Sequence, residues 1–279
     1  MILINLLSIS GGTVALAAWL KRSRIPPVLA LLYGFYPGLF LALRFDLTEV
    51  LAFGLTATAI YVFSYGPTLR LPLATALFAL AGLTREITLI FPLVFAASLL
   101  FRNGELGLGP RLYRSGLPAL AVAAGSFAPV LLWHLLMGLW LGGMTAAPGP
   151  VVQPVPFRGI LYYWPWGFKQ FEEIVIVIAP SLLTAVLSVW AWRRGLLSVA
   201  TVMVLIQVVL FVIFIHPQSF PDLTASARYA IGIVLAALLS IPIFDRLFNG
   251  KRTWLVLCAL CWLLPMPWYL LKPFVVPGA

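Results

Sequence analysis

The sequence predicts an all-α polytopic membrane protein, a single bundle of about ten transmembrane helices. Of its 279 residues, 62% are apolar and only 9% are charged, and the mean hydropathy is +1.06. These values lie far outside the range of soluble globular domains. Since a membrane-spanning helix needs about 20 apolar residues, little of the chain is left for a soluble domain. We therefore expect residues 1–279 to form one transmembrane domain.

Apolar runs bounded by charges or by Gly and Pro turns give the positions of the expected spans. The runs are 2–20, 25–43, 49–65, 71–83, 86–101, 116–141, 174–192, 196–215, 229–244 and 253–271. The fourth and fifth runs are short and meet at Thr84, Arg85 and Glu86. We expect a helical hairpin there, because a single helix would move every later loop to the other side of the membrane.

The charged residues between these runs predict the orientation of the protein. One set of alternate loops carries twelve cations, among them Arg194, Arg246 and Lys251, against two anions, whereas the other set carries six of each. Cytoplasmic loops are enriched in Lys and Arg, so the first set is expected in the cytoplasm and both ends of the chain on the outer face. The net charge of +10 thus indicates membrane orientation, and no nucleic-acid partner is expected.

The one long loop, 142–173, belongs to the outer set. Four of its prolines, Pro148, Pro150, Pro154 and Pro156, precede Tyr162, Tyr163, Trp164 and Trp166. This pattern indicates a loop that lies along the bilayer surface, with its rings at the depth of the lipid headgroups. Aromatic rings also stack on the apolar faces of sugars, so a binding role for this ring cluster stays open.

Polar residues on the outer side gather in a few places and are the candidates for a binding site. The substrate-binding candidates are Arg44, Asp46, Glu49, Arg85, Glu86, His216, Arg228 and Tyr229. Arg85 follows an apolar run of only 13 residues, and a charge in such a place usually pairs or binds an anion. The planar guanidinium of Arg228 could hold a phosphate through two parallel hydrogen bonds.

Structural roles compete with binding for several of these candidates. Asp46 and Glu49 fit a capping box at the start of a helix. Thr84 suits a helix N-cap, with Glu86 in the first turn. These roles do not exclude binding.

Five residues have a structural interpretation of their own. Arg228 could anchor the chain at the membrane interface together with the tyrosine that follows it, and His216 could be structural. His134 lies inside an apolar run, where it favours an interhelical hydrogen bond. Cys258 and Cys261 share one apolar run without further metal ligands, which favours packing over a metal site.

Several segments of the chain carry a resemblance to a known family. They are Tyr36-Pro-Gly-Leu-Phe with Arg44-Phe-Asp-Leu-Thr-Glu49, Ala81-Gly-Leu-Thr-Arg-Glu-Ile-Thr-Leu-Ile-Phe-Pro92, Pro156-Phe-Arg-Gly159 and Ala227-Arg-Tyr-Ala230. In their order and spacing they resemble the bacterial branch of the polytopic GT-C glycosyltransferases, which are implicated in cell-surface glycopolymer formation. The resemblance extends over most of the chain and implies a GT-C-like fold in the bacterial plasma membrane.

The same resemblance implies a function. A sugar would pass from a polyprenyl-phosphate carrier to a glycan or lipid acceptor on the outer face. Arg44, Arg85 and Arg228 would hold the lipid phosphate, and the neighbouring carboxylates would orient the arginines or the sugar hydroxyls. An arginine site needs no metal, so no cofactor is expected. On this resemblance, we expect the family's first span and its first outer loop, which carries the catalytic acid, to be missing from this sequence. The catalytic base is therefore left unassigned.

Two other functions stay open at this stage. A secondary transporter would carry polar groups near the bilayer midplane and would consist of two related halves. A noncatalytic scaffold or a fragment of an enzyme would need neither feature.

Overall fold

The fold is that of a helical bundle. The computed structural model describes residues 2–65, 70–100, 116–142, 154–217, 220, 223–251 and 262. In this part of the chain the elements are helices, which confirms the predicted all-α class. Apolar residues from most of them share one buried core.

Four helices of the described residues are long and apolar enough to cross a membrane. They are α1 (Ile2–Arg22), α7 (Leu117–Trp140), the helix Phe168–Arg193 that contains α9 (Phe168–Glu173) and α10 (Ala179–Arg193), and the helix Ser226–Leu247 that ends with α13 (Ile231–Leu247). The number rises to five when Pro27–Gly34, which ends with α2 (Leu31–Gly34), is joined across a 44° bend to α3 (Pro37–Arg44). The chain is therefore a helical protein with several apolar helices of membrane length.

The prediction of ten spans is wrong for the described residues, because four of the expected spans form shorter helices of 10–17 residues. These are α4 (Glu49–Tyr65), α5 (Arg70–Thr84), the helix Glu86–Leu99 that contains most of α6 (Ile90–Leu100), and the helix Val199–Ile213 that begins with α11 (Val199–Val208). At 1.5 Å per residue, even 17 residues extend only about 26 Å, which is less than a typical hydrocarbon core of about 30 Å. The tenth expected span, 253–271, lies outside the described residues except for Trp262.

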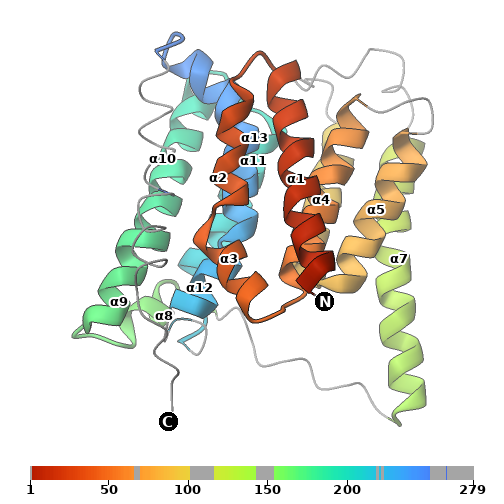
Figure 1. The fold of residues 1–279 in the computed structure, drawn as a ribbon, viewed down its shortest axis with the longest axis horizontal. Coiled ribbons are helices and arrows are strands. Elements are labelled where there is room, and N and C mark those ends of the chain that lie inside the picture. Colours follow the sequence, from red (N-terminus) through yellow and green to blue (C-terminus); the bar gives the residue numbers. More distant parts are fainter. Residues whose placement is uncertain are drawn as a thin grey trace.

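The helices run up and down, so the bundle has two ends (Figure 1). At one end, Glu49 at the start of α4 hydrogen-bonds with Arg85, which directly follows α5. At the other end, Arg22 at the end of α1 donates to the carbonyl oxygen of Tyr65, the last residue of α4, over 3.5 Å. We call these the Glu49 end and the Arg22 end. Arg85 lies at the Glu49 end, and Phe95 of α6 packs back against Phe63 of α4 and Phe78 of α5, with ring centroids 5.2 and 6.1 Å apart, so the predicted hairpin is confirmed for residues 71–100.

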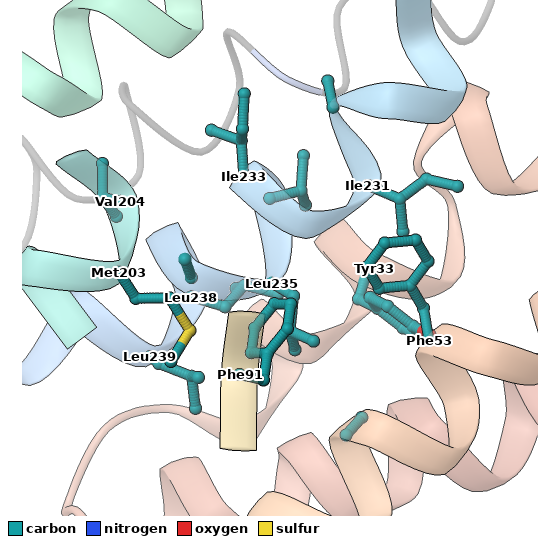
Figure 2. Packing of buried hydrophobic residues seen from close by; sticks show 14 of the residues in the cluster. Tyr33, Phe53, Phe91, Met203, Val204, Ile231, Ile233, Leu235, Leu238 and Leu239 are labelled. Atoms are coloured by element: carbon teal, nitrogen blue, oxygen red, sulfur yellow. The ribbon is translucent and has the colours of Figure 1, made fainter. Parts of the chain in front are cut away.

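α13 forms the centre of the bundle and α7 forms its edge (Figure 1). Within the membrane-length windows, 78% of the residues are buried in the helix that contains α13, but only 17% in α7. Figure 2 shows the apolar packing around α13, with Ile231, Ile233, Leu235, Leu238 and Leu239 near Tyr33, Phe53, Phe91, Met203 and Val204. Large side chains of α7, such as Leu139 and Trp140, remain exposed, as expected for a helix that faces lipid.

Small residues let α1 and α4 pack closely. A side chain at Gly54 of α4 would come within 2.6 Å of the carbonyl oxygen of Ser8 in α1. Interfaces between membrane helices commonly use such small residues for backbone approach. This packing brings Asn5 of α1 to the start of α4, where its amide donates to Asp46 over 3.0 Å and to the carbonyl oxygen of Leu47 over 3.3 Å.

Candidate functional site

A cavity of about 530 Å³ opens at the Glu49 end of the bundle. It is lined by Glu49, Phe53, Leu83, Thr84, Arg85, Glu86, Ile87, Ile90, Phe211, Arg228 and Tyr229. These residues come from α4, α5, the short 3₁₀ helix Glu86–Leu89, α6, the helix Val199–Ile213 and α12 (Leu223–Tyr229). We call it the Glu49 cavity. Its walls are largely apolar, and its charges come from two arginines and two glutamates.

Glu49 is the residue that both arginines of this cavity contact. Its side chain is only 6% exposed, and its Oε1 atom accepts hydrogen bonds from Nη2 of Arg85 and, over 3.4 Å, from Nη1 of Arg228. Its other carboxylate oxygen, Oε2, is buried and has no hydrogen-bond partner among the described residues. A buried carboxylate is costly unless it is paired, so the two arginines make the burial of Glu49 tolerable.

Two guanidinium groups share one oxygen of this carboxylate. The side chain of Arg85 is 42% exposed and that of Arg228 is 24% exposed. A guanidinium has five N–H donors, and Arg85 uses one of them on Glu49. Arg85 therefore retains donors for an anionic ligand in the cavity.

The second glutamate, Glu86, is held from the edge of the bundle. Its Oε1 atom lies 2.6 Å from Nε2 of His134 in α7. The expected interhelical hydrogen bond of His134 is thereby confirmed. Since Glu86 is 65% exposed, this pair ties α7 to the rim of the cavity and does not form part of the buried cluster.

The turn that presents Arg85 follows from its local sequence. Thr84 ends α5, and its Oγ1 atom donates back to the carbonyl oxygen of Leu80 over 2.7 Å. Arg85 then takes an extended backbone, with φ −154° and ψ 113°, before the 3₁₀ helix Glu86–Leu89 begins. The interpretation of Thr84 as an N-cap is therefore wrong, because its hydroxyl bonds within the preceding helix. One extended residue between two helices turns the chain and leaves Arg85 at the cavity.

Arg228 is positioned by close packing between α12 and α3. A side chain at Gly38 of α3 would come within 2.2 Å of the carbonyl oxygen of Ala227, the residue before Arg228. Tyr229 follows and stacks on Phe211, with ring centroids 6.3 Å apart and an interplanar angle of 5°. Two of the segments behind the family resemblance are thus in contact next to Arg228.

Five of the eight candidate residues line the cavity, and three do not. Arg44 ends α3, and its guanidinium lies over the ring of Phe45 at 5.7 Å. Asp46 takes a left-handed backbone, with φ 52°, and accepts from Asn5. His216 also lies outside the residues that line the cavity.

The capping-box interpretation of Glu49 is wrong. α4 begins at Glu49 itself, and the carboxylate of Glu49 binds two arginines instead of reaching back to the preceding backbone. A local pattern cannot reveal partners that lie 36 and 179 residues away in the chain.

A second buried carboxylate was not among the candidates. Glu173 at the end of α9 is fully buried and accepts a hydrogen bond from Oγ of Ser226 over 3.1 Å. Ser226 lies two residues before Arg228, so this contact helps to fix α12. Like Glu49, Glu173 directly precedes an apolar run, and this position in the sequence could have marked it as a candidate for a buried carboxylate.

The aromatic residues of the loop 142–173 lie outside the cavity. The described part of this loop, from residue 154, contains α8 (Arg158–Leu161) and α9. Trp164 and Phe168 are about two thirds exposed, at 67% and 66%. Tyr163 donates its hydroxyl to the carbonyl oxygen of Pro217 over 3.1 Å. Exposed rings are compatible with both the interfacial and the sugar-stacking interpretation, so both stay predictions.

The arrangement is chemically suited to hold an anion. Among the described residues, no group of three or more His, Cys, Asp or Glu side chains lies close enough to hold a metal ion. The cationic side chains that line the cavity are those of Arg85 and Arg228. No protein-family model, curated protein or solved structure matches this chain. The features that bear on function are therefore the apolar helices of membrane length and the cavity with two arginines around a buried glutamate.

Proposed function

We propose that the Glu49 cavity binds the phosphate of a lipid-linked sugar and that the protein acts as a GT-C-like membrane glycosyltransferase. The observation that carries the proposal is the pair Arg85 and Arg228 around the buried Glu49 in a cavity with apolar walls. The family resemblance supports the sugar-transfer part of the proposal.

Phosphate is the anion that fits this geometry best. The planar fork of a guanidinium matches the oxygens of a phosphate and gives two parallel charge-assisted hydrogen bonds. Glu49 holds both arginines in place before a ligand arrives, so little side-chain ordering remains to be done on binding. A carboxylate ligand would offer fewer acceptor oxygens to two arginines at once.

An apolar groove next to the cavity supports a lipid as the source of the phosphate. The groove has a volume of about 720 Å³ and lies between α5 and α7. Its lining residues are Leu71, Pro72, Thr75, Ala76, Ala79, Leu80, Leu83, Ala121, Gly125 and Pro129. Leu83 lines the groove and the Glu49 cavity alike, so the two spaces meet at that residue. An amphiphile can place its phosphate at Arg85 and its prenyl chain along α5.

The chemistry of transfer assigns distinct tasks to these residues. When a sugar leaves a polyprenyl phosphate, negative charge grows on the phosphate, and arginines at that position stabilise it. Glu49 acts as a positioning residue, since its carboxylate is engaged by both arginines. On the charge bias of the loops, we place the Glu49 end at the outer face of the bacterial plasma membrane, where a glycan or lipid acceptor would be available.

The proposal is tested by the binding of polyprenyl phosphate to purified variants in detergent. Arg85→Ala removes the guanidinium, and Arg85→Lys keeps the charge but removes the planar fork. Loss of one charged hydrogen-bond partner costs about 1.5 to 3 kcal/mol, so we expect binding about 10- to 100-fold weaker in both variants.

The matched control is Arg158→Ala. Arg158 is exposed in α8, at the same end of the bundle (Figure 1), and does not line the cavity. Its loss should leave binding unchanged. Undiminished binding in both Arg85 variants would show that this arginine only neutralises Glu49, and the proposed phosphate site would have to be abandoned.

A further inference from the structure

A second cavity, of about 450 Å³, lies where α10 and α13 end. This is the Arg22 end of the bundle, opposite the Glu49 cavity (Figure 1). The described residues that line it are Trp190, Arg194, Leu196, Arg246, Leu247, Phe248, Asn249 and Lys251. They belong to only two segments, the last turn of α10 with the turn after it and the last turn of α13 with the turn after it. We call this space the basic cavity.

The charge of the basic cavity is of one sign. Arg194, Arg246 and Lys251 line it, and no acidic residue is among the described residues that do so. Asp245 directly precedes Arg246 but does not line the cavity. Three cations around one concave space favour an anionic ligand.

The cavity also has an apolar wall. The rings of Trp190 and Phe248 meet edge to face, with centroids 5.7 Å apart and an interplanar angle of 74°. This contact joins α10 to α13, and Leu196 and Leu247 extend the apolar surface. Tryptophan is enriched at the depth where lipid headgroups meet acyl chains. A ligand of this cavity therefore has an anionic and an apolar part.

Helix dipoles alone do not explain this arrangement. Cations in the last turn of a helix are stabilised by its dipole, and this accounts for Arg193 in the last turn of α10, which does not line the cavity, and for Arg246 in the last turn of α13, which does. Lys251 lies beyond the end of α13. A turn with positive φ at Asn249 (53°) and Gly250 (73°) folds the chain back, and the amide of Lys251 donates to the carbonyl oxygen of Phe248 over 3.1 Å. The turn thus brings a third cation to the cavity.

We propose that the basic cavity binds the phosphodiester headgroup of an anionic membrane lipid, for which phosphatidylglycerol is the probe. The phosphate lies among the three cations, and the glycerol backbone and first methylene groups lie on Trp190 and Phe248. Basic pockets between the ends of membrane helices are known to hold such headgroups. This site is independent of the proposed phosphate site in the Glu49 cavity.

The test counts bound lipids by native mass spectrometry and measures their affinity in detergent. The test variant is Arg194→Gln/Arg246→Gln/Lys251→Gln. Arg193→Gln is the control for the loss of one cation at the end of α10, and Arg194→Gln alone is compared with it at equal charge. We expect phosphatidylglycerol to bind the triple variant about 10- to 100-fold more weakly and to bind Arg193→Gln as it binds the wild type. Circular dichroism verifies that each variant keeps its helices.

Three further arms define the ligand. Phosphatidylcholine, which has the same phosphate but no net charge, should bind weakly to the wild type. Inorganic phosphate should not displace phosphatidylglycerol; displacement at similar concentrations would assign the cavity to a free anion and overturn the lipid assignment. Arg85→Ala should retain phosphatidylglycerol binding, which separates this site from the Glu49 cavity. Equal binding to the triple variant and the control would show that these cations only complement helix ends, and the proposal would fail.

Discussion

The two ends of the bundle use arginine in opposite ways. At the Glu49 end, Arg85 and Arg228 are held by a buried carboxylate. At the Arg22 end, Arg194 directly follows α10 and Arg246 lies in the last turn of α13. Both line the basic cavity, and none of the described residues that line it is acidic. The first arrangement fixes guanidinium groups in one geometry, and the second concentrates positive charge.

This difference has an energetic consequence. A fixed pair of arginines costs the burial of a carboxylate but gives a geometry that can select one kind of phosphate. Cations near the membrane surface cost little, because their charges remain near water, and they attract anionic headgroups of many kinds. On our two proposals, the Glu49 end recognises one kind of phosphate, whereas the Arg22 end contacts anionic lipid.

The sidedness of the two ends gives the largest expected effect. In a chain whose native cysteines are replaced by serine, we expect Tyr162→Cys at the Glu49 end to react with a membrane-impermeant maleimide in intact cells. Asn249→Cys at the Arg22 end should react only after the cells are opened. The reason is the excess of Lys and Arg in the loops expected in the cytoplasm. The reverse pattern of labelling would place the Glu49 cavity in the cytoplasm.

The next largest effect is expected on stability. Glu49→Gln leaves two partly exposed guanidinium groups without their carboxylate, so we expect the free energy of unfolding to fall by about 2 kcal/mol. The measurement is unfolding in mixed detergent micelles, followed by circular dichroism. Glu86→Gln is the matched control, because Glu86 is exposed and its pair with His134 should contribute less than about 1 kcal/mol. Similar small losses in both variants would show that Glu49 does not organise this end.

The sequence predicted the contrast between the two ends only in part. The charge pattern correctly assigned Arg85 and Arg194 to opposite ends of the bundle. It could do so because the loops between apolar runs lie alternately at one end and at the other. The pattern also brought Arg85 and Arg228 into one set of candidates. It could not show that both share Glu49, since that contact depends on how α4, α5 and α12 pack.

Local patterns misled where long-range packing decides. Glu49 and Thr84 match the residue types of helix caps, yet one is an ion-pair partner and the other bonds to Leu80 within α5. The number of spans was overestimated because runs of fewer than 18 residues were counted as spans: α4 has the predicted bounds, 49–65, and is still too short. Arg44 and Asp46 are close to Glu49 in sequence but outside the cavity, because the chain reverses direction between α3 and α4 (Figure 1).

A smaller effect is expected from the packing that positions Arg228. Gly38→Val would push α12 away from α3, since even a Cβ atom at Gly38 would lie 2.2 Å from the carbonyl oxygen of Ala227. We expect a loss of about 1 to 3 kcal/mol in the free energy of unfolding. The control is Gly11→Val, because no atom lies within 4 Å of a Cβ at that position. If both variants unfold alike, the contact between α3 and α12 does not set the position of Arg228.

The smallest effect should come from filling the groove. Ala76→Phe places a ring in the groove between α5 and α7, and we expect about fivefold weaker binding of a long-chain polyprenyl phosphate, equivalent to roughly 1 kcal/mol of apolar contact. A short-chain prenyl phosphate should bind equally well to wild type and variant. Leu73→Phe is the control on the same helix, since Leu73 is exposed but does not line the groove. Equal losses for both chain lengths would place the prenyl chain elsewhere.

The most direct test of the central claim is to map where a polyprenyl phosphate binds. A derivative with a photoreactive group next to the phosphate is bound to the wild-type protein, irradiated, and located by mass spectrometry of peptides. The account predicts cross-links at 83–90 and 228–229, the segments that carry Arg85 and Arg228, and their loss in Arg85→Ala. Cross-links concentrated at 190–196 and 246–251, or spread along the exposed face of α7, would contradict it.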